Sequence, residues 1–275
     1  MILLKTLQKL EFPKKLGLCE LLFSKSLESR GIVIIKTAHG LQWKLDMRNS
    51  THRWIVYGLY DPPFLTWAKK FLPKNGLVVD SGANIGQTAQ YLGRLVPEGR
   101  LFAFEPGRKQ ADWLRECIEL NKLELPTTQV QPFALGEKKE QLYLEDTWKS
   151  ERFHGGSSEI SKERGEPIEV VRLDEFLSQK GIKSLDLWKL DVEGYELPAL
   201  KGAESLLKAQ KIRALYVELY RQDGEEFKQH GIKIRELLSN YGYVCHVFEP
   251  NTRRLRREMK WTHSADGLFL PRTHA

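Results

Sequence analysis

Cysteine is scarce in this sequence, and long apolar runs are absent. The 275 residues include three cysteines, which stand far apart at Cys19, Cys117 and Cys245. This spacing excludes a paired-cysteine metal motif and favours a reducing compartment. No uncharged stretch approaches the ~20 residues of a membrane-spanning helix. The first residues are apolar before they are basic, and no small-residue cleavage site follows, so we expect a cytoplasmic protein without a signal peptide.

Nucleic-acid-binding motifs are also absent, although the chain is basic. No helix-turn-helix, zinc finger or aromatic RNA-binding signature occurs. The formal net charge is nevertheless +7. Basic residues gather at Lys14 and Lys15, between Arg94 and Arg115, and between Arg253 and Arg257. We interpret these runs as solvated faces, and a role in attracting nucleic acid, a phosphorylated substrate or membrane headgroups stays open.

The sequence does contain a glycine-rich turn directly after an apolar strand. The run DSGANIG at residues 80–86 follows Leu77-Val78-Val79, which predicts a parallel strand ending in a turn that opens a helix near Gln87. Gly82 and Gly86 allow backbone geometry and close approach that a Cβ would obstruct. The Asp80 carboxylate would repel a pyrophosphate, whereas it suits the amino acid moiety and sulfonium of S-adenosylmethionine.

A second strand, Arg100 to Phe104, ends at Glu105 and Pro106. An acidic residue in this place accepts hydrogen bonds from two ribose hydroxyls. The alternative, in which Asp80 and Glu105 only cap helices, requires the same coincidence twice. The candidate cofactor-binding residues are Asp80, Ser81, Gly82, Ala83, Asn84, Gly86, Thr88, Glu105, Pro106, Phe133 and Asp191.

From residue 71 to 275 the strands alternate with helices, which is typical of a doubly wound α/β sheet. The last two strands are separated by a basic stretch without a convincing helix, so we expect a C-terminal antiparallel strand, as methyltransferases have. We predict helices near 87–95, 108–121, 196–208 and 231–241. The seven predicted strands lie near 77–80, 101–104, 128–134, 185–191, 213–219, 243–248 and 267–270.

The pattern of residues 1–70 predicts a small N-terminal α/β appendage, which we expect to act as a cap or to contact a partner. Leucines at helical spacing indicate one or two amphipathic helices over residues 1–30, broken at Pro13. Alternation from Gly31 to Leu45 indicates a hairpin that turns at residues 38–40. The first 25 residues either pack on the catalytic domain or a partner subunit, or form a basic interfacial helix that contacts a membrane peripherally.

A second motif, LDLWKLDVEGYEL at residues 185–197, places three ionisable residues at alternate positions near a strand end. Lys189, Asp191 and Glu193 can face the same side while the strand lasts. Ionisable residues are costly in a buried strand unless they are paired or used. The motif therefore indicates either the rim of a site or a buried ion pair.

The runs DSGANIG at 80–86, FEP at 104–106, LDEF at 173–176, LWKLDVEGYEL at 187–197 and LKGA at 200–203 resemble, in this order, the FkbM family of S-adenosylmethionine-dependent methyltransferases. The resemblance covers about residues 45–220. It implies a class I methyltransferase (Rossmann-like) fold and O-methylation of a hydroxyl on a sugar or natural product, so the expected partner is a small-molecule or glycan acceptor. Trp188 stands where the family commonly has an aliphatic residue, and we expect this departure to affect packing.

Methyl transfer to an alcohol requires alignment and removal of a proton. Candidates for the base are Asp191 and Glu193, Glu218 at the end of the strand over 213–219, and His154 in the glycine-rich loop. Lys189 completes the catalytic set, because it would keep Asp191 ionised. We predict no metal site, although three carboxylates at one crevice leave Mg²⁺ as an alternative. We expect the loop from Trp148 to Ser161 to close over the acceptor.

Three alternatives stay open. The run DPPF at residues 61–64 matches a motif of nucleic-acid and protein N-methyltransferases, but it precedes the glycine turn and reads as a helix entered through prolines. A dinucleotide-dependent oxidoreductase would need small residues where Ile85 and Gln87 stand. A fold that only binds a partner is the third alternative.

Overall fold

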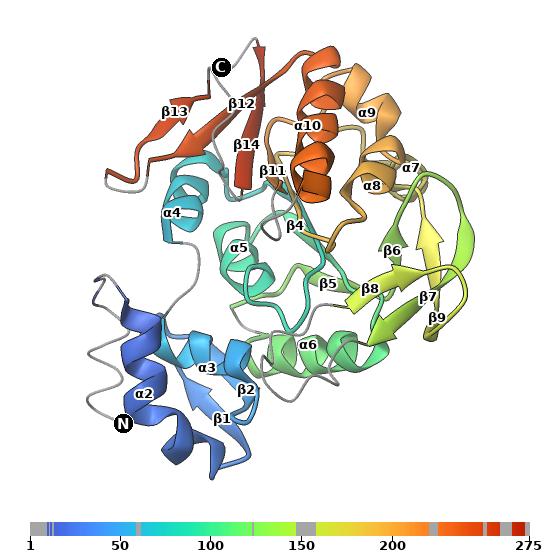
Figure 1. Ribbon diagram of the computed structural model, residues 1–275. Helices are drawn as coiled ribbons and strands as arrows, with labels where there is room; N and C mark the ends of the chain where they lie inside the picture. The colour runs from blue at the N-terminus through green and yellow to red at the C-terminus, as the bar shows by residue number, and fades with distance from the viewer. Residues whose placement is uncertain are drawn as a thin grey trace.

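A large mixed sheet dominates the computed structural model of the chain (Figure 1). The structure describes residues 10, 12, 14–58, 62–122, 124–146, 158–219, 225–249, 252–258 and 266–272. Within these residues no helix is both long and apolar enough to cross a bilayer.

The large sheet has the order β13-β12-β14-β11-β10-β3-β4-β5. Five neighbouring strands, β5, β4, β3, β10 and β11, run parallel to one another, and β14 is antiparallel to both of its neighbours. This arrangement confirms the class I methyltransferase fold and its antiparallel strand, with eight strands instead of the predicted seven. The strands are β3 (Leu77–Ser81), β4 (Arg100–Phe104), β5 (Thr128–Gln131), β10 (Leu187–Leu190), β11 (Leu215–Glu218), β12 (Tyr243–Phe248), β13 (Leu255–Arg257) and β14 (Asp266–Pro271).

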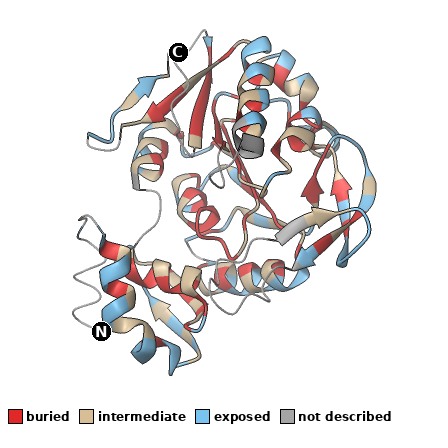
Figure 2. Ribbon diagram, viewed as in Figure 1, coloured by how far each residue is buried: buried red, intermediate tan, exposed pale blue. Residues whose placement is uncertain are grey.

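Helices cover both faces of this sheet because its strands are apolar on both sides (Figure 2). Val78 faces α4 (Pro62–Phe71), α5 (Ala89–Leu95) and α6 (Arg108–Leu120), whereas Val79 belongs to the core on the opposite face. The helices of that opposite face are α7 (Leu173–Gln179), α8 (Glu196–Lys201), α9 (Glu204–Lys208) and α10 (Glu225–Asn240). The helix expected over 196–208 is thus two helices, with a break at Gly202.

A four-stranded sheet, which the sequence did not predict, flanks the large one. Its strands are β6 (Ala134–Leu135), β7 (Glu140–Asp146), β8 (Ser158–Ser161) and β9 (Glu166–Val171), in the order β6-β9-β7-β8. The end of the expected acceptor loop, residues 158–161, is therefore strand β8, paired antiparallel with β7. Residues 148–157 of that loop, His154 among them, lie outside the described residues.

The N-terminal lobe is a helix, a hairpin and a second helix. Its elements are α2 (Lys15–Glu28), β1 (Ile32–Lys36), β2 (Gln42–Asp46) and α3 (Ser50–Tyr57), so the predicted hairpin is confirmed. The lobe packs around the buried Trp43 and Tyr57. It is joined to α6 by a hydrogen bond of 2.6 Å from Trp113 Nε1 to the carbonyl oxygen of Lys44. The helix expected before Pro13 lies outside the described residues except for Leu10 and Phe12.

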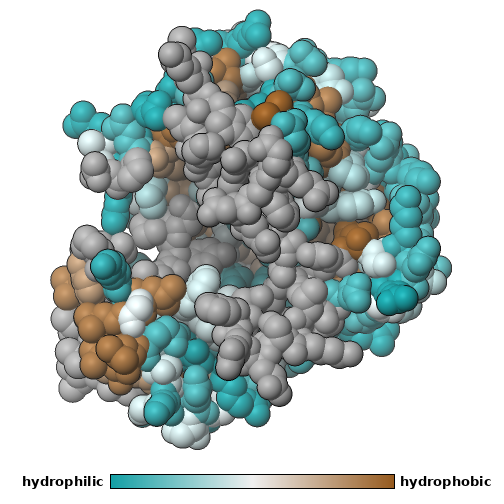
Figure 3. Space-filling view, in the orientation of Figure 1, coloured by the Kyte–Doolittle hydropathy of each residue, from teal (hydrophilic) through white to brown (hydrophobic). Residues whose placement is uncertain are grey.

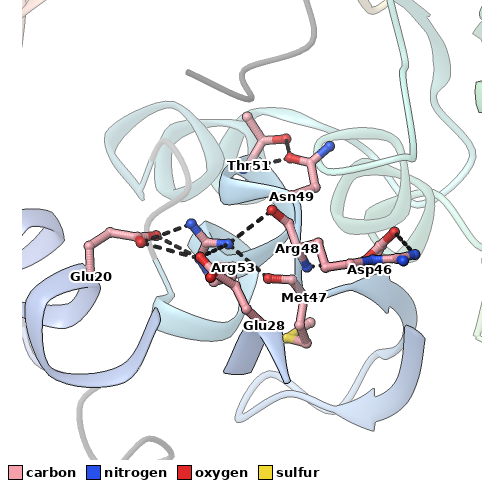
Figure 4. Close-up of polar contacts among 8 residues, drawn as sticks. All are labelled: Glu20, Glu28, Asp46, Met47, Arg48, Asn49, Thr51 and Arg53. Carbon is pink, nitrogen blue, oxygen red and sulfur yellow. Dashed lines mark hydrogen bonds and ion pairs between the residues drawn. The ribbon is translucent and has the colours of Figure 1, made fainter. Parts of the chain in front are cut away.

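Arg53 of α3 is the polar centre of this lobe (Figure 4). Its Nε and Nη2 donate to the Glu20 carboxylate of α2 at 3.0 and 2.9 Å. Its Nη1 donates to the carbonyl oxygens of Met47 and Arg48 and lies 3.2 Å from Glu28 Oε1. A buried cation with this many acceptors fixes the orientation of α2 on the hairpin.

Helix α4 packs with the large sheet, although nearly all of it lies within residues 1–70, which were expected to form the N-terminal appendage. It begins at Pro62, as the proline-entered helix was expected to do. The Phe64 ring is fully buried and stacks on Tyr216 of β11 at a centroid distance of 3.9 Å. The phenylalanine of the DPPF run is therefore a core residue, whereas Asp61 lies outside the described residues.

Candidate functional site

The glycine turn is held by the two strands beside it. Gly82, Asn84 and Gly86 have φ values of 75°, 48° and 92°. The backbone N–H groups of Gly82 and Ala83 both donate to the carbonyl oxygen of Phe104 at 3.0 Å. A Cβ at Gly82 would overlap the carbonyl oxygen of Asp191, so only glycine lets the turn meet the end of β10. Helix α5 begins at Ala89, two residues later than predicted, and Thr88 is its buried N-cap.

Asp80 and Lys189 face each other in register on the neighbouring strands β3 and β10. Lys189 Nζ lies 3.7 Å from Asp80 Oδ1 and 3.0 Å from Asp191 Oδ2. Asp80 is fully buried, and neither of its carboxylate oxygens has a hydrogen-bond partner among the described residues. Burial raises the pKa of Asp80 to about 6, although Lys189 opposes the shift. A buried carboxylate in this condition is suited to an additional cationic donor, such as an ammonium group.

Glu105, at the end of β4, ties the glycine turn to the following loop. Its Oε2 accepts from the backbone N–H of Asn84 at 2.8 Å, and its Oε1 accepts from that of Gly107 at 2.9 Å. Burial raises the pKa of Glu105 to about 7, against the effect of these two hydrogen bonds. Each oxygen keeps a second lone pair, so the carboxylate can also accept from two hydroxyls. Pro106 is half-buried beside it, and Phe133 packs against the core after β5.

Asp191 and Glu218 lie at the ends of the adjacent parallel strands β10 and β11, as expected. The Asp191 side chain is 37% exposed, so it is both paired with Lys189 and accessible. Burial, followed by repulsion from Asp191, Glu193, Glu196 and Asp266, raises the pKa of Glu218 to about 10. This shift favours the protonated form of Glu218, which can donate a hydrogen bond. Glu193 follows β10 in a left-handed conformation, with φ 56°.

Two interactions at this edge were not predicted from the sequence. Glu196 Oε1 accepts from the backbone N–H groups of Val192 and Gly194, and its Oε2 lies 2.8 Å from Nε2 of His230 on α10. Trp188 donates from its indole Nε1 to Ser81 Oγ at 2.8 Å in the buried core. Both Glu196 and Trp188 stand in the 185–197 motif, but their side-chain partners His230 and Ser81 lie far away in sequence. Together they fix the loop after β10 and connect β10 to the start of the glycine turn.

A family model described as "Methyltransferase FkbM domain" matches residues 80–245. The chain belongs to the FkbM methyltransferase family. It is 30% identical over 188 residues to Methyltransferase sdnD of Sordaria araneosa, a match that covers 56% of this chain and 70% of that protein. It is 26% identical over 181 residues to 2-O-methyltransferase NoeI of Sinorhizobium fredii (strain NBRC 101917 / NGR234), covering 62% of this chain and 73% of that protein.

Among solved structures, methyltransferase FkbM from Methylobacillus flagellatus KT aligns with a TM-score of 0.46 and 16% identity. The alignment covers 91% of this chain and 58% of that chain.

The cofactor of this FkbM methyltransferase is S-adenosylmethionine. The residues at the ends of β3 and β4 fit this cofactor. The carboxylate of Asp80, which has no hydrogen-bond partner among the described residues, suits the ammonium of the methionine moiety, and Glu105 can accept hydrogen bonds from ribose hydroxyls. In the part of the chain that the structure describes, no group of three histidine, cysteine or acidic residues is arranged to hold a metal ion.

Proposed function

We propose that this methyltransferase modifies a hydroxyl oxygen of a sugar or small natural product, with Asp191 as the residue that orients and deprotonates it. The Lys189–Asp191 pair carries this proposal. It provides a partly exposed carboxylate at the end of β10, 3.0 Å from a buried ammonium that also contacts Asp80. The name of the relative NoeI, a 2-O-methyltransferase, supports the acceptor class.

The proposed chemistry needs little from the protein beyond placement and a proton acceptor. When bound, S-adenosylmethionine supplies a methyl group on a positively charged sulfur. Asp191 would accept a hydrogen bond from the acceptor hydroxyl and take its proton as the methyl group passes from sulfur to that oxygen, which leaves S-adenosylhomocysteine. Lys189 holds the Asp191 carboxylate in place through their ion pair. The raised pKa of Glu218 favours its protonated form, which would donate a hydrogen bond to the acceptor.

The test is the isosteric variant Asp191→Asn, assayed by release of S-adenosylhomocysteine over a panel of sugars and hydroxylated natural products. Loss of the proton acceptor should lower turnover about 10²–10⁴-fold while affinity for S-adenosylhomocysteine is retained. Glu193→Gln, which makes the same chemical change two residues further along the chain, is the matched control. Near-normal turnover of Asp191→Asn would move the base to Glu193 or His154, and methyl transfer to amines alone would contradict O-methylation.

We also propose the cytoplasm as the compartment. The support is that Cys19, Cys117 and Cys245 are all free thiols, as is usual in a reducing compartment.

A further inference from the structure

Helix α2 presents three leucines to solvent. Leu18, Leu21 and Leu22 are 44%, 82% and 58% exposed, so their side chains are not part of the core of the lobe. In Figure 3 the largest apolar area gathers at the lower left, over the N-terminal lobe, while the other coloured residues on this face are mostly hydrophilic. Solitary exposed leucines need no explanation, but a cluster on one helix face indicates a contact surface.

The opposite face of α2 is fully occupied, so the leucines cannot turn inward. Cys19 and Leu27 are buried in the core of the lobe. Glu20 is held by Arg53, as described above. The exposed leucines of α2 therefore form an outer face that the described residues of the lobe leave uncovered.

Cations bracket the leucines on this face. Lys25 follows Leu21 and Leu22 by one turn on the same stripe of α2, and Lys14 is the residue directly before the helix begins. Lys14, Lys25 and the nearby Arg30 are exposed and form no ion pair within the described ranges. From residue 14 to residue 58 the chain has eight lysines and arginines against three acidic residues. The acidic Glu20 and Glu28 are already paired with Arg53.

We infer that the outer face of α2 binds the surface of an anionic lipid bilayer. Leucines flanked by lysines match the boundary between acyl chains and headgroups, where the leucines enter the apolar layer and the lysines meet anionic phosphates. A second protein is a poorer match, because the centres of protein interfaces are depleted of lysine. Juxtaposed basic residues add attraction that depends on the charge of the lipid.

The experiment is co-sedimentation of the full chain with vesicles of phosphatidylcholine, with or without phosphatidylserine. Binding should require phosphatidylserine and weaken as salt rises, because salt screens the lysines. The double variant Leu21→Ser, Leu22→Ser should lower the bound fraction about tenfold, since it removes two insertable side chains. Charge reversal in Lys14→Glu, Lys25→Glu should have a similar effect of about tenfold.

A matched control is Lys69→Glu, Lys70→Glu, which makes the same charge change on exposed residues of α4 and should leave binding at the wild-type level. Affinity for S-adenosylhomocysteine and the melting temperature, measured for every variant, show that each is folded. The proposal is overturned if the wild type does not sediment, if neutral vesicles bind as well, or if the control pair lowers binding equally. It is also overturned if the chain dimerises in solution and Leu21→Ser, Leu22→Ser abolishes the dimer, because the face would then bind a second copy.

Discussion

The N-terminal lobe and the cofactor edge, which is the end of the large sheet that carries Asp80, Glu105, Lys189 and Asp191, each contain a buried cation between two carboxylates. The two clusters differ in how many of their polar atoms have hydrogen-bond partners. Arg53 donates to Glu20 and to two backbone carbonyls, and it also contacts Glu28. Lys189 lies between Asp80 and Asp191, yet both oxygens of Asp80 lack hydrogen-bond partners among the described residues. A complete cluster stabilises the fold, whereas an incomplete buried cluster has capacity for a ligand.

This contrast predicts opposite effects when each cation is removed. Arg53→Met should lower the free energy of unfolding by about 3–5 kcal/mol, because Glu20 would be left uncompensated. Its effect on affinity for S-adenosylhomocysteine should be small. Lys189→Met should cost less stability, because Asp80, with its raised pKa, can take a proton, but it should weaken cofactor binding.

Urea denaturation and calorimetric titration of both variants measure the two effects. Arg48→Met, which removes an exposed arginine paired with Asp46, is the control for loss of a cation from the lobe and should hardly change the unfolding midpoint. Equal losses of stability and affinity in Arg53→Met and Lys189→Met would remove the distinction between the clusters.

The comparison extends to Glu105, the second buried carboxylate of the edge. Glu105→Ala should weaken binding of S-adenosylhomocysteine by about 1.5–3 kcal/mol for each charge-assisted hydrogen bond lost. The same variant frees the N–H groups of Asn84 and Gly107, so circular dichroism must show that it is folded. Wild-type affinity in a folded Glu105→Ala protein would contradict the assignment to the ribose.

The pH dependence of stability isolates the same carboxyl group. The pKa of Glu105 is raised from 4.5 to about 7 on folding, so the folded state holds this proton more strongly than the unfolded state. The free energy of unfolding should therefore fall as pH rises between these two values. Glu105→Gln should show a shallower decline over this range, with the part due to Asp80 remaining. Identical slopes of unfolding free energy against pH for the wild type and Glu105→Gln would contradict a raised pKa of Glu105.

Much of the fold was predictable because its strands are apolar runs that end at turns. Leu77-Val78-Val79 is buried on both faces, so its pattern predicts a central strand directly. The edge strand β13 could not be recognised, because Leu255-Arg256-Arg257 is short and basic. In the four-stranded sheet the strands are short and their pattern is irregular: in β9 only Ile168 and Val170 are buried, and a proline and two glutamates stand among the six residues.

The site was predictable only where its parts are adjacent in sequence. The pairing of Lys189 with Asp191 follows from their alternation on one strand. The contact between Glu196 and His230 depends on how α10 packs against α8, which no local pattern encodes. The raised pKa of Glu218 likewise results from its burial and from four carboxylates that the tertiary structure brings near it.

The smallest predicted effect concerns two tryptophans, one in each region. Trp188 and Trp43 are both fully buried, but Trp188 donates its indole N–H to Ser81, whereas Trp43 Nε1 has no partner among the described residues. Changing either to phenylalanine removes the same volume. Trp188→Phe alone should also lose a hydrogen bond worth about 0.5–1.5 kcal/mol and leave the start of the glycine turn less firmly held.

Calorimetric titration with S-adenosylhomocysteine should therefore show weaker binding for Trp188→Phe and wild-type binding for Trp43→Phe, while thermal melts show a loss of stability for both. A double-mutant cycle with Ser81→Ala separates the hydrogen bond from the change in packing. If Trp188 acts on the turn through Ser81, the affinity losses of the two single variants will not add in the double variant. Additive losses would mean that Trp188 affects the cofactor edge only by filling the core, as an aliphatic residue of the same volume would.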